Sequence, residues 1–409
     1  MSLILENCRV FDGWNVELRE GVSIEMEGGL IRGIAPGRIA SERARRIDVA
    51  GRFVMPGLID AHFHCYGASM NPRAIDAMPP ALRSLHARQL MEDALLRGFT
   101  TVRDAAGGDY ALAKGVHDGL IRGPRLFFPG LALSQTGGHG DMRHIGGEAS
   151  HYACLCRYCG ALSKVVDGEE EVRRAVREQL RHGAHHIKIF ISGGVLSPGD
   201  PLWMNQLSDA EIRAAVAEAK TRRAYVMAHA HTAEAAIRGA RNGVRSIEHG
   251  TLMDDESVAV VVEEGAFVVP TLAVIEALHE LGARLGLDAA GLGKVAEVAQ
   301  GALASLERLY KAGARIGLGT DLLGETCSRQ SREFRLRREV CSALDILRSA
   351  TRVNAELVQM EGKLGTVAEG AFADLLVLDG NPLADITVLE DTQALRLILR
   401  DAQVFKNTL

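Results

Sequence analysis

The composition of this 409-residue chain does not favour a protein that binds nucleic acids or membranes. Charged residues make up 24% of the sequence and the formal net charge is −5, so there is no basic surplus to attract phosphate groups. Aromatic residues are scarce, at 5%. No run approaches the ~18 consecutive apolar residues that a membrane-spanning helix needs. We therefore expect neither nucleic acid nor a membrane among its partners.

Cysteine is also sparse, and its seven positions are odd in number and irregularly spaced, which does not predict a disulfide framework. Cys154, Cys156 and Cys159 form a C-x-C-x-x-C pattern. A closed structural zinc site needs four ligands, which His151 could complete, but three reduced thiols in a loop is the simpler interpretation. The start, MSLILENCRV, lacks a basic segment followed by a long apolar run, so we expect no signal peptide and a cytoplasmic protein.

Glycine, by contrast, is plentiful, with 44 residues, and it divides the two ends of the chain into short apolar runs. Residues 3–54 consist of such runs, with turns expected at Asp12-Gly13 and Gly28-Gly29. The chain becomes β-like again from Gly362. We expect residues 1–55 and 363–409 to build one small β-sandwich from both termini, and residues 56–362 to form a separate domain.

The middle of the chain alternates strands with helices. Residues 169–180 carry Val172, Val176 and Leu180 on one helical face, and Ser208 with Glu211 forms a capping box. Eight strands separated by helices over roughly 265 residues predict an α/β fold of the (β/α)8, TIM-like barrel type. A doubly wound open sheet is the alternative. The expected strands are residues 58–64, 99–104, 124–130, 185–192, 224–230, 244–250, 266–271 and 314–321.

One connection is unusually long. Residues 131–168 are rich in glycine and polar residues and show no clear periodicity. A segment of this kind is usually a functional loop or a disordered one. We expect it to form a lid over the mouth of the barrel.

Side chains that bind metals gather at the expected strand ends. In a barrel, the catalytic residues sit at the carboxyl ends of the strands. The first strand ends in MPGLIDAHFH, where residues two apart on a strand point to the same side, so both imidazoles face one spot. An isolated H-x-H is most often a pair of exposed histidines, and a lone buried histidine is most often structural. Several ends of this kind together predict a metal site. The residues at these ends are His62, His64, Lys188, His229, His231, His249 and Asp321.

This pattern resembles the amidohydrolase superfamily, whose binuclear members use H-x-H, a carboxylated lysine, two further histidines and an aspartate. The resemblance covers essentially the whole chain. Within the superfamily the chain is most similar to the group of prolidases, Xaa-Arg carboxypeptidases and ochratoxin-type amidases. The segments that carry this similarity are GFTTVRDAAG, LSQTGGHGD, ISGGVLSPGDP, SIEHGTLMDDE and GLGTDLLGE.

The resemblance implies two divalent metal ions. Imidazole and carboxylate ligands without thiolate favour Zn²⁺, with Mn²⁺ or Co²⁺ as possible substitutes. Lys188 would be carboxylated and bridge the ions; the alternative is a buried lysine paired with a carboxylate, but its neighbours Ile187 and Ile189 are apolar. The implied metal ligands are His62, His64, Lys188, His229, His249 and Asp321.

The remaining roles concern the substrate. A hydroxide that bridges the ions would attack the carbonyl, with Asp321 as general base and then acid. By the resemblance, His231 would bind the carbonyl or the oxyanion. His139, in TGGHGD, would contact the substrate, although an exposed loop histidine explains it equally well. Arg103 and Asp104 end the second strand, and an ion pair inside the barrel would explain them without catalysis.

We therefore expect a metal-dependent hydrolase that cleaves a C–N amide bond in a small-molecule substrate, either a dipeptide such as Xaa-Pro or an N-acyl amino acid. The first alternative is a hydrolase of a cyclic amide or imidazolone-type ring. The second is a non-catalytic scaffold, which would be expected to lose metal ligands. The sequence leaves open the preferred side chains, the native metal and whether the chain forms a homo-oligomer.

Overall fold

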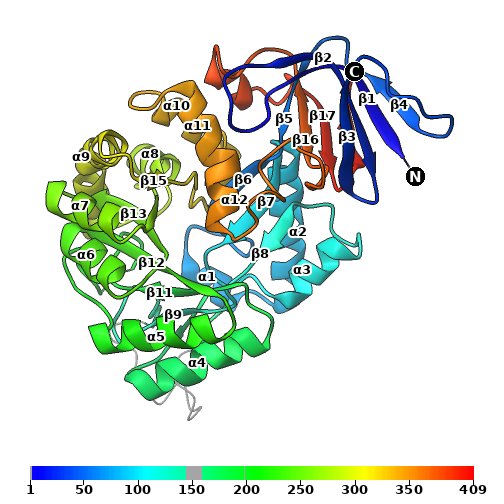
Figure 1. Cartoon of the computed structure of the whole chain (residues 1–409). Coiled ribbons are helices and arrows are strands. Elements are labelled where there is room, and N and C mark those ends of the chain that lie inside the picture. The colour runs from blue at the N-terminus through cyan, green and yellow to red at the C-terminus, as the bar shows by residue number, and fades with distance from the viewer. Residues whose placement is uncertain (1, 144–158, 198) are drawn as a thin grey trace.

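A computed structural model describes residues 2–143, 159–197 and 199–409, whose strands form three sheets (Figure 1). One sheet is mixed and is built from the two ends of the chain. The other two are parallel and have helices packed around them (Figure 1). The predicted α/β class and parallel strands are therefore confirmed.

The terminal sheet joins the first and last strands of the chain. Its order is β18-β17-β16-β5-β1-β2-β3, with β4 beside β1, and β5 pairs with β16 so that Val54 lies opposite Val377. The two ends thus share one sheet and one apolar core, which agrees with the predicted joint domain of both termini. The strands are β1 (Leu3–Val10), β2 (Arg19–Glu27), β3 (Leu30–Pro36), β4 (Arg45–Asp48), β5 (Phe53–Pro56), β16 (Leu375–Leu378), β17 (Leu395–Arg400) and β18 (Gln403–Asn407).

The parallel strands include all eight that the sequence predicts, most of them shorter than expected. One sheet has the order β6-β7-β8, and the other has the order β10-β9-β11-β12-β13-β14-β15. The strands are β6 (Leu58–Phe63), β7 (Phe99–Asp104), β8 (Arg125–Phe127), β9 (Ala132–Ser134), β10 (Ser163–Val165), β11 (His186–Phe190), β12 (Tyr225–Thr232), β13 (Ser246–Leu252), β14 (Phe267–Val269) and β15 (Arg315–Ile316).

The single closed barrel that we predicted is not present as continuous strand pairing. The interruption lies between β8 and β9, where the chain turns through Gly130 with a φ of 71°. At the other edge, backbone bonds connect β6 with the segment after β15: Ala61 N–H donates to Leu318 O at 2.8 Å, and Asp321 N–H donates to His62 O at 2.8 Å. This second connection places His62 and Asp321 beside each other.

The helices pack on the outside of the parallel strands (Figure 1). Helix α4 buries Val172, Val176 and Leu180, and α5 begins with the predicted Ser208–Glu211 capping box. The helices are α1 (Pro72–Ala77), α2 (Pro80–Leu96), α3 (Tyr110–His117), α4 (Glu169–Arg181), α5 (Asp209–Thr221), α6 (Ala233–Arg241), α7 (Asp255–Glu263), α8 (Leu272–Leu281), α9 (Ala289–Lys311), α10 (Arg332–Arg337), α11 (Ala343–Arg348) and α12 (Asn354–Leu357).

The long connection predicted as a lid is more regular than expected in the part that the structure describes. It contains β9 and β10, which pair with each other in parallel, and β9 also pairs with β11. His151, Cys154 and Cys156 lie outside the described residues, and Cys159 is a free, exposed thiol. Within the described ranges, no helix is long and apolar enough to cross a membrane.

Candidate active site

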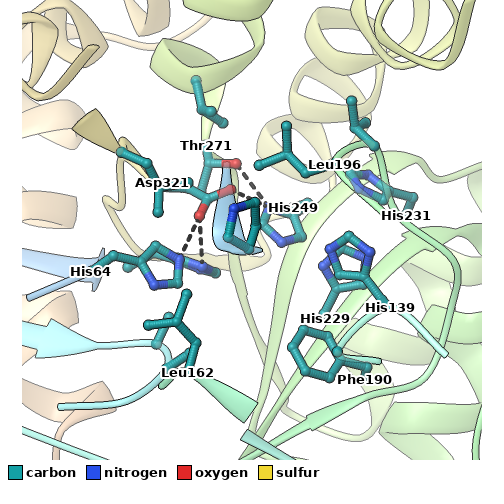
Figure 2. Close-up of a pocket in the computed structure, with 18 of the residues that line it drawn as sticks. His64, His139, Leu162, Phe190, Leu196, His229, His231, His249, Thr271 and Asp321 are labelled. Atoms are coloured by element: carbon teal, nitrogen blue, oxygen red, sulfur yellow. Dashed lines mark hydrogen bonds and ion pairs between the residues drawn. The ribbon is translucent and has the colours of Figure 1, made fainter. Parts of the chain in front are cut away.

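All of the site residues predicted from the sequence line one pocket. They come from the carboxyl ends of the parallel strands and from the loops that follow, and Figure 2 shows several imidazoles turned toward a common space. The structure therefore brings together residues more than 250 positions apart. The lining residues that the sequence singled out are His62, His64, His139, Lys188, His229, His231, His249 and Asp321.

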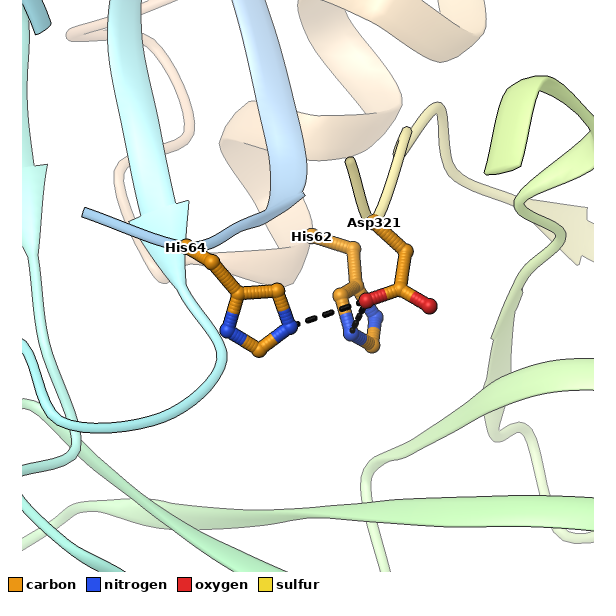
Figure 3. A group of neighbouring side chains, drawn as sticks. All are labelled: His62, His64 and Asp321. Atoms are coloured by element: carbon orange, nitrogen blue, oxygen red, sulfur yellow. Dashed lines mark hydrogen bonds and ion pairs between the residues drawn. The ribbon is translucent and has the colours of Figure 1, made fainter. Parts of the chain in front are cut away.

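The tightest group consists of His62, His64 and Asp321 (Figure 3). Asp321 Oδ1 lies 2.8 Å from His64 Nε2 and 3.3 Å from His62 Nε2. One ligand atom from each of the three lies within 4.8 Å of the others. A single cation placed among these atoms would replace the direct contacts between the side chains.

The backbone around this group is strained and closely packed. Asp321 and His249 adopt left-handed conformations, with φ of 57° and 72°, which non-glycine residues rarely do. Such strain often accompanies functional sites, where the surrounding structure holds it in place. Gly319 is packed so tightly that a Cβ there would lie 2.7 Å from the His62 Cβ. Glycine at this position allows the two strand ends to approach.

Asp321 is ionised in this setting. Burial raises the pKa of its carboxyl, but the neighbouring imidazoles of His62 and His64 outweigh burial and hold it well below its usual value. Burial likewise lowers the pKa of His62, and the Asp321 carboxylate more than reverses that effect. Because only a neutral imidazole can bind a metal, a cation that bound here would displace the proton that the raised pKa favours on His62.

Glu248 is a part of the site that the sequence interpretation missed. Its Oε2 lies 2.7 Å from His62 Nδ1, and Arg103 Nη2 donates to Oε1 at 2.8 Å. Burial raises the pKa of Glu248, but Arg103 and His62 bring it down to about 2. The ion pair expected for Arg103 is therefore made with Glu248 and not with Asp104, which accepts the N–H groups of Cys65 and Gly108. The sequence signal that could have predicted this pair was the presence of Arg103 and Glu248, which carry opposite charges, within two predicted strands.

Lys188 reaches the pocket from β11 and is 2% exposed. Its Nζ lies 5.5 Å from the centre of the Phe190 ring, and among the described residues no carboxylate forms an ion pair with it. Burial lowers the pKa of Lys188 to about 8. The paired-carboxylate alternative is thus not what the structure shows.

His229, His231 and His249 form a second cluster, on β12 and β13. The ring centres lie 4.6 Å apart for His229 and His249, and 4.9 Å apart for His231 and His249. Burial lowers the pKa of all three, for His231 to about 3, so they are neutral at physiological pH. The Nδ1 atoms of His231 and His249 are hydrogen bonded to Thr251 and Thr271, which fixes both rings.

His139 is placed over this cluster and is not an exposed loop residue. Its ring stacks on His229 with centres 4.4 Å apart, and its Nδ1 lies 2.6 Å from Ser197 Oγ and 3.3 Å from Asp200 Oδ2. Figure 2 shows the two rings side by side. This position favours a substrate-contacting histidine over an exposed loop histidine.

Much of the remaining pocket wall is apolar. Helices α8 and α9 supply much of it, and within the described residues no charged side chain from either helix lines the pocket. The pocket thus combines histidines, Lys188 and Asp321 with many apolar side chains. The apolar residues of this wall are Leu162, Val195, Leu196, Val274, Ile275, Leu278, Val295, Val298 and Leu323.

The donor set suits divalent cations. Imidazoles and an ionised carboxylate, with no cysteine among the described lining residues, fit Zn²⁺ and its first-row neighbours. His62, His64 and Asp321 form one close group. His229 and His249 lie next to it, because the His249 and His62 ring centres are 4.9 Å apart.

Comparisons with known proteins agree with this geometry. The description "Amidohydrolase family" matches residues 53–403. Ochratoxinase from Aspergillus niger is 34% identical over 364 residues, which cover 86% of this chain and 75% of that protein. A crystal structure of a prolidase complexed with N-methylphosphonate-L-proline superposes with a TM-score of 0.95 at 44% identity and covers all of both chains. A Xaa-Pro dipeptidase with bound methionine gives a TM-score of 0.89 at 31% identity, again over both whole chains.

Proposed function

The chain belongs to the amidohydrolase family and is a hydrolase, and from this premise we propose that it cleaves the amide bond of a dipeptide, Xaa-Pro or similar, or of an N-acyl amino acid. The observation that carries the proposal is one pocket lined both by eight side chains of metal-binding or proton-transferring types and by many apolar residues. The ochratoxinase and prolidase relatives support a small linear amide as the substrate.

We propose that His62, His64, His229, His249, Asp321 and a carboxylated Lys188 hold two divalent ions, with Zn²⁺ as the expected metal, in a site of the (β/α)8 type. Support for the carboxylation of Lys188 is its burial and its lowered pKa, because only a neutral amine adds CO₂. When bound, such ions supply a more acidic water and a Lewis acid for the scissile carbonyl.

The side chains of this chain would perform the remaining steps. Asp321 takes a proton from the attacking water, whose oxygen bonds to the carbonyl carbon. Asp321 then passes that proton to the nitrogen as the C–N bond breaks, and the products are a carboxylic acid and an amine. His231, held by Thr251 and neutral, is placed to donate a hydrogen bond to the developing oxyanion. His139 contacts the substrate from the same side of the pocket as His229.

A substrate panel tests the proposal. Metal-loaded enzyme is offered Xaa-Pro and other dipeptides, N-acyl amino acids, and cyclic amides of the imidazolone type, and product amines are quantified. We expect hydrolysis of linear amides with an apolar group. Turnover of ring amides with no hydrolysis of any linear amide would refute the proposal in favour of the ring-hydrolase alternative.

A further inference from the structure

The loop after β11 contributes to the pocket in two ways. Among its described residues, 193–197 and 199–201, Val195 and Leu196 belong to the apolar wall. Ser197 and Asp200 contact the His139 ring. Asp200 also accepts hydrogen bonds from Gly194 N–H at 3.0 Å and from the Gln206 side chain at 3.2 Å. One short loop therefore places both an apolar surface and a polar side chain of the site.

Lys294 holds this loop to helix α9. Its ammonium donates to three backbone carbonyls of the loop: Gly194 O at 2.9 Å, Ser197 O at 2.9 Å and Asp200 O at 2.7 Å. A lysine ammonium has three N–H donors, so all of them are used here. The next residue along α9, Val295, lines the same pocket. The attachment therefore fixes the loop to the wall that it faces.

The loop also limits where His139 can lie. A Cβ on Gly194 would meet the His139 ring at 2.2 Å, so the ring rests directly against the loop backbone. His229 bounds the ring on its stacked face, and Ser197 and Asp200 bound its edge. A displacement of the loop would move the ring with it.

From these contacts we propose that Lys294 is a positioning residue that sets substrate preference. By fixing the loop it holds the apolar surface of Val195 and Leu196 and the imidazole of His139 in one arrangement. A substrate with a bulky apolar group next to the scissile bond fills that arrangement, whereas a substrate with a glycine there does not. The inference rests on the proposed function, since it concerns which amide the same site prefers.

The test compares Lys294→Met with Lys311→Met in the full-length, metal-loaded protein. Both lysines lie on α9, but Lys311 is exposed and pairs only with Glu307 among the described residues. For each variant, kcat and KM are measured with Leu-Pro and with Gly-Pro, together with Tm and metal content. We expect Lys294→Met to lower the Leu-Pro to Gly-Pro ratio of kcat/KM roughly tenfold, a usual range for contacts of one side chain in an apolar pocket. The KM for Leu-Pro should rise most, and Lys311→Met should match the parent.

A second variant reaches the same loop by another route. Gly194→Ala keeps Lys294 but forces the His139 ring and the loop apart, and it should also lower the ratio. If Lys294 is only a structural attachment, Lys294→Met will lower Tm or yield and leave the ratio within about twofold of the parent, and that result overturns the inference. A parent enzyme that hydrolyses neither dipeptide nor any other linear amide would instead refute the proposed function.

Discussion

Replacing Glu248 with glutamine should weaken both the fold and metal binding. Glutamine keeps the shape of the side chain but removes a carboxylate that is fully buried and that contacts Arg103 and His62. Arg103 would keep neutral acceptors, among them Ala61 O, which accepts from Nε at 2.6 Å, and Ser246 Oγ, which accepts from Nη1 at 2.8 Å. A buried guanidinium would then have no counter-charge.

The size of the effect follows from those contacts. Removing one partner of a buried ion pair costs about 3–5 kcal/mol. With an unfolding entropy of about 2.1 cal/mol/K per residue, a 409-residue chain loses about 1.2 °C of Tm for each kcal/mol, which predicts a fall of about 4–6 °C for a single cooperative transition. Loss of a carboxylate that orients a metal-binding histidine typically lowers metal affinity by about 10–100-fold.

Two assays on Glu248→Gln measure these effects separately. Thermal unfolding of metal-free protein reports the loss of the ion pair, and dialysis against a graded chelator followed by elemental analysis reports metal affinity. Glu178→Gln is a suitable control, because it removes an exposed pair with Arg181, and such pairs contribute little. A Glu248→Gln protein that keeps the Tm of the parent within about 1 °C and retains metal equally well would show that the Arg103–Glu248–His62 arrangement is not what orients His62.

Four further predictions concern the metals and the proton. Elemental analysis should find about two divalent ions per chain, and chelation should abolish an activity that Zn²⁺ or Mn²⁺ restores; active enzyme free of transition metal would contradict this. Lys188→Ala should lose metal and activity and regain part of both with a short carboxylic acid, whereas an unmodified amine in fully active enzyme, seen by intact mass, would exclude the carboxylated form. Asp321→Asn should lower kcat by on the order of 10² or more with little change in KM. An Asp321→Asn enzyme within a few-fold of the parent rate would assign the proton transfer to another residue. His231→Asn should keep both metals and lose roughly 3 kcal/mol of transition-state stabilisation. The last prediction concerns the pH dependence of stability. In the folded protein the pKa of Glu248 is about 2, below its ordinary value of 4.5, so the unfolded chain binds more protons between these two pH values. The contribution of Glu248 to the free energy of unfolding is complete above pH 4.5 and is lost as pH falls toward 2. A plot of unfolding free energy against pH should therefore be less steep in this range for Glu248→Gln than for the parent.

The strands, and the gathering of the candidate residues in one pocket, could be predicted because each depends on a local pattern. A strand that ends in a histidine or an aspartate is visible in the sequence, and parallel strands bring their carboxyl ends to one edge, as happens for His62 and Asp321. The eight predicted strands were all found for this reason. The prolidase and ochratoxinase resemblance, stated from long segments of sequence, was likewise confirmed.

What could not be predicted depends on long-range contacts. The partner of Arg103 is decided by which strands lie across the pocket, and Glu248 is 145 residues away. The strands β9 and β10 have three residues each, too few to show a period in a glycine-rich segment. The interruption between β8 and β9 coincides with a left-handed conformation at Gly130, which sequence alone does not reveal among so many glycines.

The terminal sheet affects how this chain must fold. Val54 and Val377, which face each other across β5 and β16, are separated by more than three hundred residues. Contacts of such long range form slowly, and a strand edge that waits for its partner is open to pairing with other chains. During synthesis, β1 to β5 emerge first, and the apolar edge of β5 stays unpaired until nearly the whole chain has left the ribosome. The yield of folded protein should therefore depend on how long that edge is exposed, and slower synthesis at low temperature with chaperones present should favour it.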